Sequence, residues 1–297
     1  MNGQVIATLA PFVSGGSVIA PRRFSVSRVV GIVERHAPTW INLVPTIIAY
    51  LLSAASGAGA RRFPSVRFAR SASAPLAPEQ QRAFERVFGI PVFEAMGMTE
   101  TASVAFCNPQ DPARRKYGSV GLPCGVEAKV VDPASGRALP DGVAGEICLR
   151  GPNVMAGYCK ESPEQTAQAF DRDGFLRSGD LGYRDADGYY FVTGRLKELI
   201  IKGGENIAPR EIDEALLRHP AVLEAAAVGV PDPAYGQEIV AFVVPKPHAA
   251  PVRRGAARMV HRGTRPLRRR RANSGWSRNS RRGRRGKIQR LKLAEAL

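Results

Sequence analysis

The sequence is poor in the residues and segments that mark several common protein classes. Its 297 residues include four cysteines, Cys107, Cys124, Cys148 and Cys159, with no C-x-x-C pair and no histidine nearby at ligand spacing. This scarcity argues against a structural zinc site or a disulfide framework and favours a reducing, cytoplasmic location. No apolar run approaches the ~18 residues of a membrane span. The first residues lack the basic flank and cleavage site of a signal peptide, so we expect neither a signal peptide nor a transmembrane segment.

Acidic residues are nearly absent from the last fifty positions. Residues 248–297 carry 17 Lys and Arg but one acid, Glu295, and so account for +16 of the formal net charge of +17. Residues 1–247 have a net charge of only +1. Over the whole chain this charge suggests a nucleic-acid or membrane-surface partner. Because the excess charge lies in residues 248–297, a nucleic-acid or membrane partner is suggested for that tail alone. Trp276 is the only aromatic residue in the tail.

Histidines are also few, and two of the four, His248 and His261, lie in the basic tail. The sequence therefore offers no catalytic triad. Hydrophobic residues make up 44% of the chain, which is enough for a buried core, and the length suggests one or two domains. The 30 glycines and 23 prolines lie between periodic segments, as in a loop-rich α/β protein.

Helix and strand patterns alternate over the first hundred residues. A first helix ends before a turn at Gly15-Gly16, and Ser25 and Thr46 are placed to begin later helices. The patterns predict strands at 17–21, 41–45, 66–73 and 90–97 and helices at 24–35, 46–53 and 77–88. Strand–turn–helix units of this kind predict a largely parallel sheet with helices on its faces.

The pattern changes after Lys116. Short strands at 125–132, 145–151 and 188–194, separated by glycine turns, predict an antiparallel, barrel-like subdomain. A smaller unit follows from Leu196. Its pattern predicts a strand at 198–204, a helix at 209–220 and strands at 224–231 and 237–246.

Three glycine-containing segments carry side chains suited to nucleotide chemistry. Gly97-Met98-Thr99-Glu100 places a hydroxyl beside a carboxylate, which suits a phosphate with a divalent metal, although for this tetrapeptide alone a capping turn with Thr99 as N-cap is the favoured explanation. Ser178-Gly179-Asp180 can hold the two hydroxyls of a ribose or form an Asx turn. The segment 194–206 pairs cationic side chains with a glycine loop, and a solvated strand edge is its alternative.

Together, in order and spacing, five segments resemble the adenylate-forming superfamily, which contains acyl-CoA synthetases, peptide-synthetase adenylation domains and luciferases. The segments are SASAPL (71–76), EAMGMTE (94–100), GEICLRGPNVMAGY (145–158), residues 178–209 and GKIQR (286–290). The resemblance covers roughly residues 1–246 and the last dozen positions.

The resemblance implies an α/β fold with several parts. Residues 1–193 would be the C-terminal part of the large adenylating domain, with a parallel-type sheet and a small β-barrel subdomain. Residues 194–247 would be the small, mobile α+β domain. The Arg-rich segment 248–285 would precede the lysine-motif end of that domain at 286–297.

It also implies roles for individual residues in the large domain. Thr99 would bind phosphate, Glu100 would hold Mg²⁺, and Asp180 would bind the ribose hydroxyls. Residues at the adenine would be Ser73, Ala74 and Pro75 from one segment and Glu94, Ala95, Met96 and Gly97 from another. Many members carry an aromatic residue at the position of Met96, so adenine stacking is absent here.

The remaining implied roles lie in the smaller domain. Arg195 would assist at the ribose, and Lys197 would be the hinge between the domains. Gly203 and Gly204 would help form the tunnel for the acceptor thiol. Lys287 would bridge the carboxylate and the α-phosphate during adenylation, where negative charge builds up.

The implied function is ATP-dependent ligation of a carboxylic acid to coenzyme A. The acid attacks ATP to give an acyl-adenylate and pyrophosphate, and a thiol then displaces AMP. The expected partners are a fatty or related organic acid, ATP and CoA, with Mg²⁺ as cofactor and no specific nucleic acid. A peptide-synthetase adenylation domain and a catalytically inactive fragment are the alternatives.

The sequence departs from the family at both ends. The family's glycine-rich phosphate loop is not present, so we expect part of the large domain to be missing upstream. The elements that the family carries next are not legible in residues 248–285, and shifted reading frames around Met259 and Trp276 permit family-like residues there. We therefore favour reading-frame slips as the origin of the Arg-rich segment over a real polybasic tail.

Overall fold

The computed structural model describes residues 2–22, 24–55, 63–159, 163–246, 272–273 and 290–294. Most of the Arg-rich segment and Lys287 lie outside these ranges, so the expectations about them stay predictions. The chain divides into two compact units, Met1–Val192 and Thr193–Leu297. Within the described residues, no helix combines the length and the apolar character needed to cross a bilayer.

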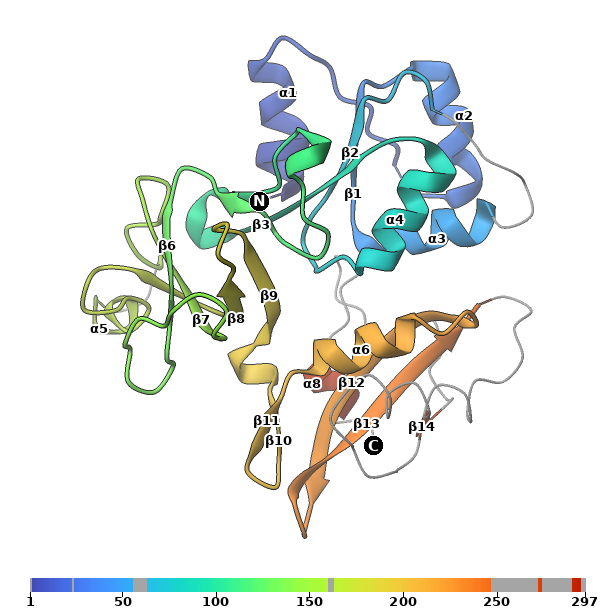
Figure 1. Ribbon diagram of the computed structural model, residues 1–297. Coiled ribbons are helices and arrows are strands. Elements are labelled where there is room, and N and C mark those ends of the chain that lie inside the picture. Colours follow the sequence, from blue (N-terminus) through green and yellow to red (C-terminus); the bar gives the residue numbers. More distant parts are fainter. Residues whose placement is uncertain are drawn as a thin grey trace. The chain divides into compact units, whose positions relative to one another are not determined.

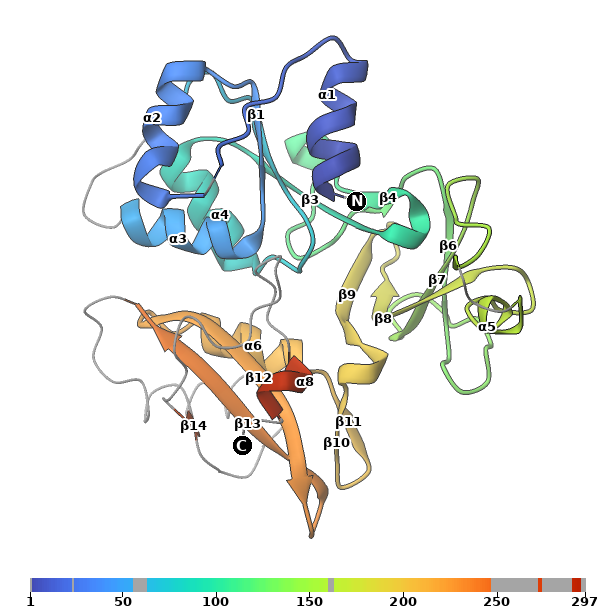
Figure 2. The same cartoon turned by 180° about the vertical axis from the view of Figure 1, so that it is seen from behind.

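The larger sheet of the first unit combines parallel and antiparallel strands. Its order is β1 (Trp40–Leu43), β2 (Phe68–Ser71), β3 (Val92–Met98), β4 (Ser103–Cys107) and β5 (Leu122–Pro123). The first three strands are parallel, as the alternating pattern predicts, and the last two pair antiparallel. The helices of this region are η1 (Asn2–Leu9), α1 (Ala10–Val13), α2 (Val26–His36), α3 (Pro45–Ala55), α4 (Pro78–Phe88) and the short turn η2 (Thr99–Thr101). In Figures 1 and 2, α2, α3 and α4 lie on one side of β1 and β2, and α1 lies on the other.

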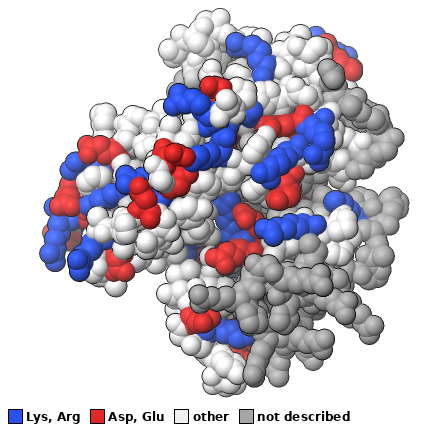
Figure 3. All heavy atoms as spheres, in the orientation of Figure 1, with Lys and Arg blue, Asp and Glu red and all other residues white. Residues whose placement is uncertain are grey.

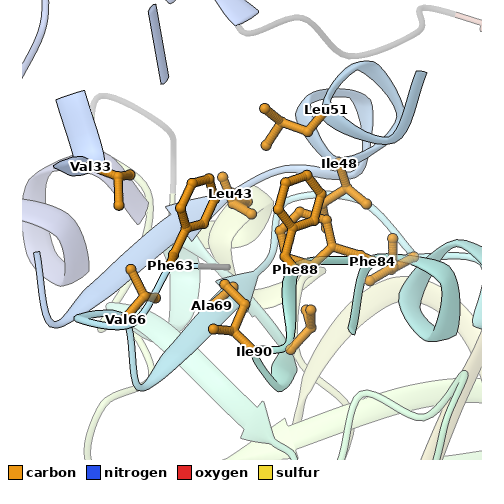
Figure 4. Packing of buried hydrophobic residues seen from close by; sticks show 12 residues of the cluster. Val33, Leu43, Ile48, Leu51, Phe63, Val66, Ala69, Phe84, Phe88 and Ile90 are labelled. Atoms are coloured by element: carbon orange, nitrogen blue, oxygen red, sulfur yellow. The ribbon is translucent and has the colours of Figure 1, made fainter. Parts of the chain in front are cut away.

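The core of this region lies between the sheet and α2–α4. Phe84 and Phe88 of α4 are buried in contact with each other, and Phe88 also stacks on Phe63 (Figure 4). Burying each such ring contributes about 1.5–3 kcal/mol. Pro78 begins α4 and Gly89 ends it in a left-handed conformation with φ +71°, so local sequence fixes both ends of this helix.

Two predicted elements of this region differ in the structure. Residues 17–21 form no strand, because hydrophobic alternation alone does not make one without a partner ladder. Helix α3 begins at Pro45, so Thr46 lies inside the helix and is not its cap. Proline is favoured at the first helical position, because its missing N–H has no helical partner there.

The rest of the first unit is an antiparallel sheet, as predicted. Its linear order is β6 (Glu127–Val131), β7 (Gly145–Arg150), β8 (Leu176–Arg184) and β9 (Tyr190–Arg195). The short helices are η3 (Pro112–Arg114) and α5 (Pro163–Ala167). A second core joins this sheet to β4, where the Phe106 and Tyr190 rings lie 4.8 Å apart. Strand β8 was not predicted, because its polar residues interrupt the apolar alternation.

The second unit is built on one mixed sheet. Its order is β11 (Glu205–Ile207), β10 (Ile200–Lys202), β13 (Gly236–Pro245) and β12 (Val222–Asp232), and β14 (Ala272–Asn273) pairs with β13. The helices are η4 (Leu196–Glu198), α6 (Pro209–Leu217) and α8 (Arg290–Ala294). Ile212 of α6 packs with Ala225 and Ala227, whereas Leu293 of α8 packs with Ala226 and Val228. Because successive strand residues face opposite ways, α6 and α8 cover opposite faces of β12.

Charged side chains of both signs are interspersed over the described part of the surface in Figure 3. This mixture accords with the net charge of +1 over residues 1–247.

Candidate functional site

The turn after β3 presents the hydroxyl and the carboxylate that the sequence singled out. Thr99 and Glu100 lie in η2, directly after the last strand residue, and Thr99 is exposed. The chain then reverses into β4 with Ala102 at φ +50° and Ser103 at φ +114°. Gly97 permits this reversal, because a Cβ there would lie 1.4 Å from the Ser103 carbonyl oxygen. Glycine is therefore required at position 97, because the backbone of Ser103 approaches it too closely for a side chain. The resulting turn places Thr99 and Glu100 directly after the strand.

The segment 151–158 packs against this turn. The Tyr158 hydroxyl donates to Glu100 Oε1 at 3.2 Å, and the Met155 N–H donates to the Glu100 carbonyl at 2.7 Å. The Asn153 amide donates to the Thr101 carbonyl at 3.1 Å. Burial, and then the Glu100 carboxylate, raise the pKa of Tyr158, so the phenol remains a donor at neutral pH. Two of the five motif segments thus meet at Glu100.

Glu100 fits the magnesium site that the resemblance implies. Mg²⁺ is usually held by one or two carboxylates together with substrate phosphates and water. Glu100 is half-buried, and its carboxylate accepts a hydrogen bond from a neutral hydroxyl. Among the described residues, no group of three or more His, Cys, Asp or Glu could hold a metal without a substrate.

The predicted adenine segment follows β2 and is tied to β3. Ser73, Ala74 and Pro75 are exposed, and Ser73 takes a left-handed φ of +76°. The N–H of the next residue, Leu76, donates to Glu94 Oε1 at 3.0 Å. Glu94 is only 1% exposed, so its carboxylate anchors this loop from within the protein.

The other adenine residues of β3 differ in their surroundings. Ala95 is buried, whereas Met96 is half-buried and packs against the second core of the first unit. Gly97 is exposed at the end of the strand. Contact of these residues with adenine stays a prediction.

Asp180 lies in β8 within a tightly bonded turn. The Ser178 hydroxyl donates to the Ile147 carbonyl at 2.6 Å, and the Asp180 N–H donates to Ser178 Oγ at 3.0 Å. Gly179 has φ +68°, and its N–H donates to Glu146 Oε1 at 3.0 Å. The structure thus joins the segments 145–150 and 178–180, and Asp180 is largely buried.

The sequence reasoning assigned no role to Glu146. This residue is 2% exposed on β7, and its other carboxylate oxygen lies 2.8 Å from Arg177. It therefore holds the backbone of the turn that carries Asp180. The signal available in the sequence was an acidic residue inside an otherwise apolar strand pattern, GEICLRG.

The residues predicted in the smaller domain lie in the second compact unit. Arg195 at the end of β9 and Lys197 in η4 are both exposed. Gly203 and Gly204 form the turn between β10 and β11, with φ +59° and +82°. Two successive positive φ values match a two-residue hairpin turn, which explains the paired glycines. Thr99, Glu100 and Asp180 belong to the first unit, and Lys287 lies outside the described residues.

One buried cation was also missed by the sequence reasoning. Arg70 of β2 is 8% exposed and donates to Asn42 Oδ1 on β1 at 3.2 Å. Burial lowers the pKa of its guanidinium, and the neighbouring Cys107 on β4 partly opposes that shift. Since Ala69 faces the α2–α4 core, strand alternation puts Arg70 on the opposite face of the sheet. A basic residue inside the strand at 66–73 was the available signal.

Comparisons with known proteins identify the family. A family model described as "AMP-binding enzyme" matches residues 1–159, and one described as "AMP-binding enzyme C-terminal domain" matches residues 211–266. Among curated proteins, the chain is 63% identical to a sulfoacetate–CoA ligase of Cupriavidus necator over 244 residues, which are 82% of this chain and 47% of the relative. It is 39% identical to an oxalate–CoA ligase of Arabidopsis thaliana over 249 residues, or 83% of this chain and 48% of the relative.

Solved structures show the same relationship. The ATP-bound MatB of Rhodopseudomonas palustris matches with a TM-score of 0.86 and 32% identity, covering 99% of this chain and 57% of that one. The chain thus spans about half the length of the curated relatives it matches. The predicted family and α/β fold are confirmed. Because one family model alone matches more than half of the residues, the chain belongs to the AMP-binding enzyme family, within the adenylate-forming superfamily.

Proposed function

We propose that this chain supplies the nucleotide- and acid-binding parts of an ATP-dependent carboxylate–CoA ligase. The carboxylate attacks the α-phosphate of ATP, and pyrophosphate leaves. The CoA thiol then attacks the acyl carbon, and AMP leaves as the thioester forms. The observation that carries this proposal is the meeting of the segments 94–100 and 151–158 at Glu100, beside an exposed Thr99.

The chain's own side chains fit the first step. Thr99 would donate its hydroxyl to a phosphate oxygen, and the Glu100 carboxylate would hold Mg²⁺. Asp180 accepts hydrogen bonds from the ribose, and Arg195 and Lys287 supply positive charge. Bound Mg²⁺ would neutralise phosphate charge. Donors and cations held near developing charge lower the barrier of such a step.

We further propose that the acid is short and carries a second anionic group. Relatives are named for sulfoacetate and oxalate, and each of these acids has an anion besides the reacting carboxylate. Arg70 is a buried guanidinium that donates to Asn42 Oδ1. Its planar fork suits bidentate binding of an anion, so the second anion of the substrate is the ligand that we propose for it. A fatty acid offers no such group, and its use stays a prediction that the same assay tests.

The test is acid-dependent exchange of pyrophosphate into ATP by the purified chain. The acids are sulfoacetate, oxalate and octanoate. We expect exchange with the first two, and in Arg70→Gln we expect the KM for them to rise about tenfold or more. Arg67→Gln, an exposed arginine just before β2, is the matched control and should leave KM unchanged.

Other outcomes count against the proposal in distinct ways. A preference for octanoate would refute the dianionic substrate and favour a fatty acid. Exchange that depends on an amino acid would favour a peptide-synthetase adenylation domain. An absence of exchange with every acid, together with no ATP-induced rise in melting temperature, would favour the inactive fragment.

A further inference from the structure

Strand β8 is irregular at the point where it carries Asp180. Its pairing with β7 shifts register between Glu146 and Cys148, and residues 178–180 of β8 form a bulge there. A bulge bends its strand and re-aims a side chain, and bulges are common beside functional sites. The direction of the Asp180 carboxylate therefore depends on how this bulge is held.

The Glu146 carboxylate holds the bulge with both of its oxygens. Oε1 accepts the Gly179 N–H at 3.0 Å, in the middle of the bulge. Oε2 accepts from Arg177, with Nε at 3.0 Å and Nη2 at 2.8 Å. Because Glu146 is only 2% exposed, its charge depends on these donors in place of water. The carboxylate and the backbone of the bulge are thus held in one arrangement.

Arg177 is also anchored outside the bulge. Its Nη2 carries two hydrogens, and besides Glu146 it donates to the Pro133 carbonyl at 3.2 Å, in the turn after β6. Its backbone pairs with Cys148 of β7, where the regular ladder resumes. The guanidinium therefore links the Glu146 carboxylate to a turn that belongs to neither β7 nor β8. Rotation of the carboxylate is opposed by Gly179 at one oxygen and by Arg177 at the other.

We propose that Glu146 and Arg177 are positioning residues for ribose recognition, and that they act through the bulge that carries Asp180. This inference rests on the proposed function, in which Asp180 accepts hydrogen bonds from the ribose. The three residues lie in the first unit, so the inference needs no contact with the second. Glu146 does not meet the nucleotide itself, because both of its oxygens are used and almost none of its surface is exposed.

Glu146→Gln is the informative variant, because it nearly preserves the shape of the side chain. Glutamine has one acceptor oxygen, so it can accept from Gly179 or from Arg177 but not from both. Arg177→Lys is the milder variant. Lysine keeps the charge but lacks the planar fork that directs two N–H groups at one carboxylate.

The experiment measures nucleotide binding to the purified full chain by isothermal titration calorimetry. The ligands are ATP, 2′-deoxy-ATP and 3′-deoxy-ATP, and each deoxy nucleotide lacks one ribose hydroxyl. We expect the unmodified chain to bind ATP about tenfold more tightly than either analogue, because each loses a hydrogen bond to a charged group. Asp180→Ala sets the benchmark and should reduce this ratio to about twofold or less. Glu146→Gln should reduce it to about threefold or less, and Arg177→Lys should reduce it by a smaller factor.

The matched controls break comparable ion pairs on the same sheet. Glu127→Gln removes a β6 carboxylate that pairs with Arg150 of β7 at 2.7 Å. Arg184→Lys replaces an arginine of β8 that pairs with Asp141 at 2.5 Å. Both controls should keep the tenfold preference for ATP.

A second readout tests the route through the bulge. Amide hydrogen exchange in peptides that span residues 176–184 should speed up in Glu146→Gln and Arg177→Lys but not in Glu127→Gln. A reduced ATP preference in Glu146→Gln with unchanged hydrogen exchange would overturn the inference, because Glu146 would then act on the nucleotide directly. Equal weakening of all three nucleotides, together with a lower urea midpoint, would also overturn it, because that result indicates a merely structural role.

Failure of the inference and failure of the proposed function give different results. A preference for ATP that is lost in Asp180→Ala but intact in Glu146→Gln would overturn the inference and leave the proposed function standing. If the unmodified chain binds the three nucleotides equally, or binds none of them, the ribose contact of the proposed function is refuted.

Discussion

Glu100 is the residue of the proposed nucleotide site that the structure fixes most firmly. Its carboxylate accepts from Tyr158 at 3.2 Å and its carbonyl from Met155 at 2.7 Å, so its backbone and side chain are both fixed. We expect Glu100→Gln to lower the adenylation rate by about a hundredfold or more and to raise the Mg²⁺ concentration needed for half-maximal rate. Tyr158→Phe should cost far less, because the hydroxyl only orients the carboxylate.

The measurement for this prediction is a Mg²⁺ titration of pyrophosphate exchange. Glu79→Gln serves as the control, because Glu79 is a largely exposed residue of α4. An unchanged Mg²⁺ dependence in Glu100→Gln would remove this residue from the metal site.

Cys148 illustrates how burial sets the chemistry of a single side chain. It lies in β7 with no exposed surface, and burial, followed by the Glu146 charge, raises its pKa to about 12. The thiolate is the nucleophilic form, so we expect Cys148 to resist iodoacetamide at about pH 8.5 in the native protein. Cys124 and Cys159 are exposed and should react. Mass spectrometry of labelled peptides checks this, and native labelling of Cys148 at the rate of Cys124 would contradict it.

At the scale of elements, two glycines should behave in opposite ways. Gly97 sits where β3 turns back, and a Cβ there would lie 1.4 Å from the Ser103 carbonyl oxygen. Gly31 lies in the middle of α2 and is exposed, and a Cβ added there would have no other atom within 4 Å. We expect Gly97→Ala to destabilise the protein by about 3 kcal/mol or more. Gly31→Ala should stabilise it by about 0.5–1 kcal/mol, since alanine loses less backbone entropy in a helix.

Urea unfolding of the two variants measures both effects in one experiment. Equal midpoints for Gly97→Ala and the unmodified chain would mean that the turn after β3 can rearrange. That result would also weaken the placement of Thr99 and Glu100.

Predicted and observed elements agree best where local signals mark both ends of an element. Pro78 and Gly89 bound α4, and the prediction of 77–88 is within one residue of Pro78–Phe88. Residues 17–21 have a strand-like composition but form no strand, because a strand depends on a neighbour that composition does not specify. Strand β8 has the neighbours β7 and β9 and forms despite its polar residues.

At the scale of the whole molecule, the charge has a defined location. Residues 248–285 contain 14 arginines and no acid, whereas residues 1–247 have a net charge of +1. A functional polybasic tail, the alternative to a reading-frame slip, predicts that the chain binds DNA without sequence preference and with an affinity that falls steeply as salt rises. Deleting 248–285 should abolish that binding, which a titration with labelled duplexes at several salt concentrations measures. Binding by the deletion variant with an unchanged salt slope would place a nucleic-acid surface in the remaining residues.

The sequence by itself determined the family and singled out the residues that we propose to carry its chemistry. Ordered motifs such as EAMGMTE and GKIQR are short, continuous stretches of sequence. Gly97 is needed for a close backbone contact, and Gly203 and Gly204 are needed for positive φ angles in a turn. Only the tertiary structure decided which distant groups support them. Glu146 holds the turn of Asp180 from 33 residues away, and Asp213 holds Arg290 from 77 residues away. Such contacts depend on which strands pair and which faces the helices cover, and these are properties of the whole packed chain.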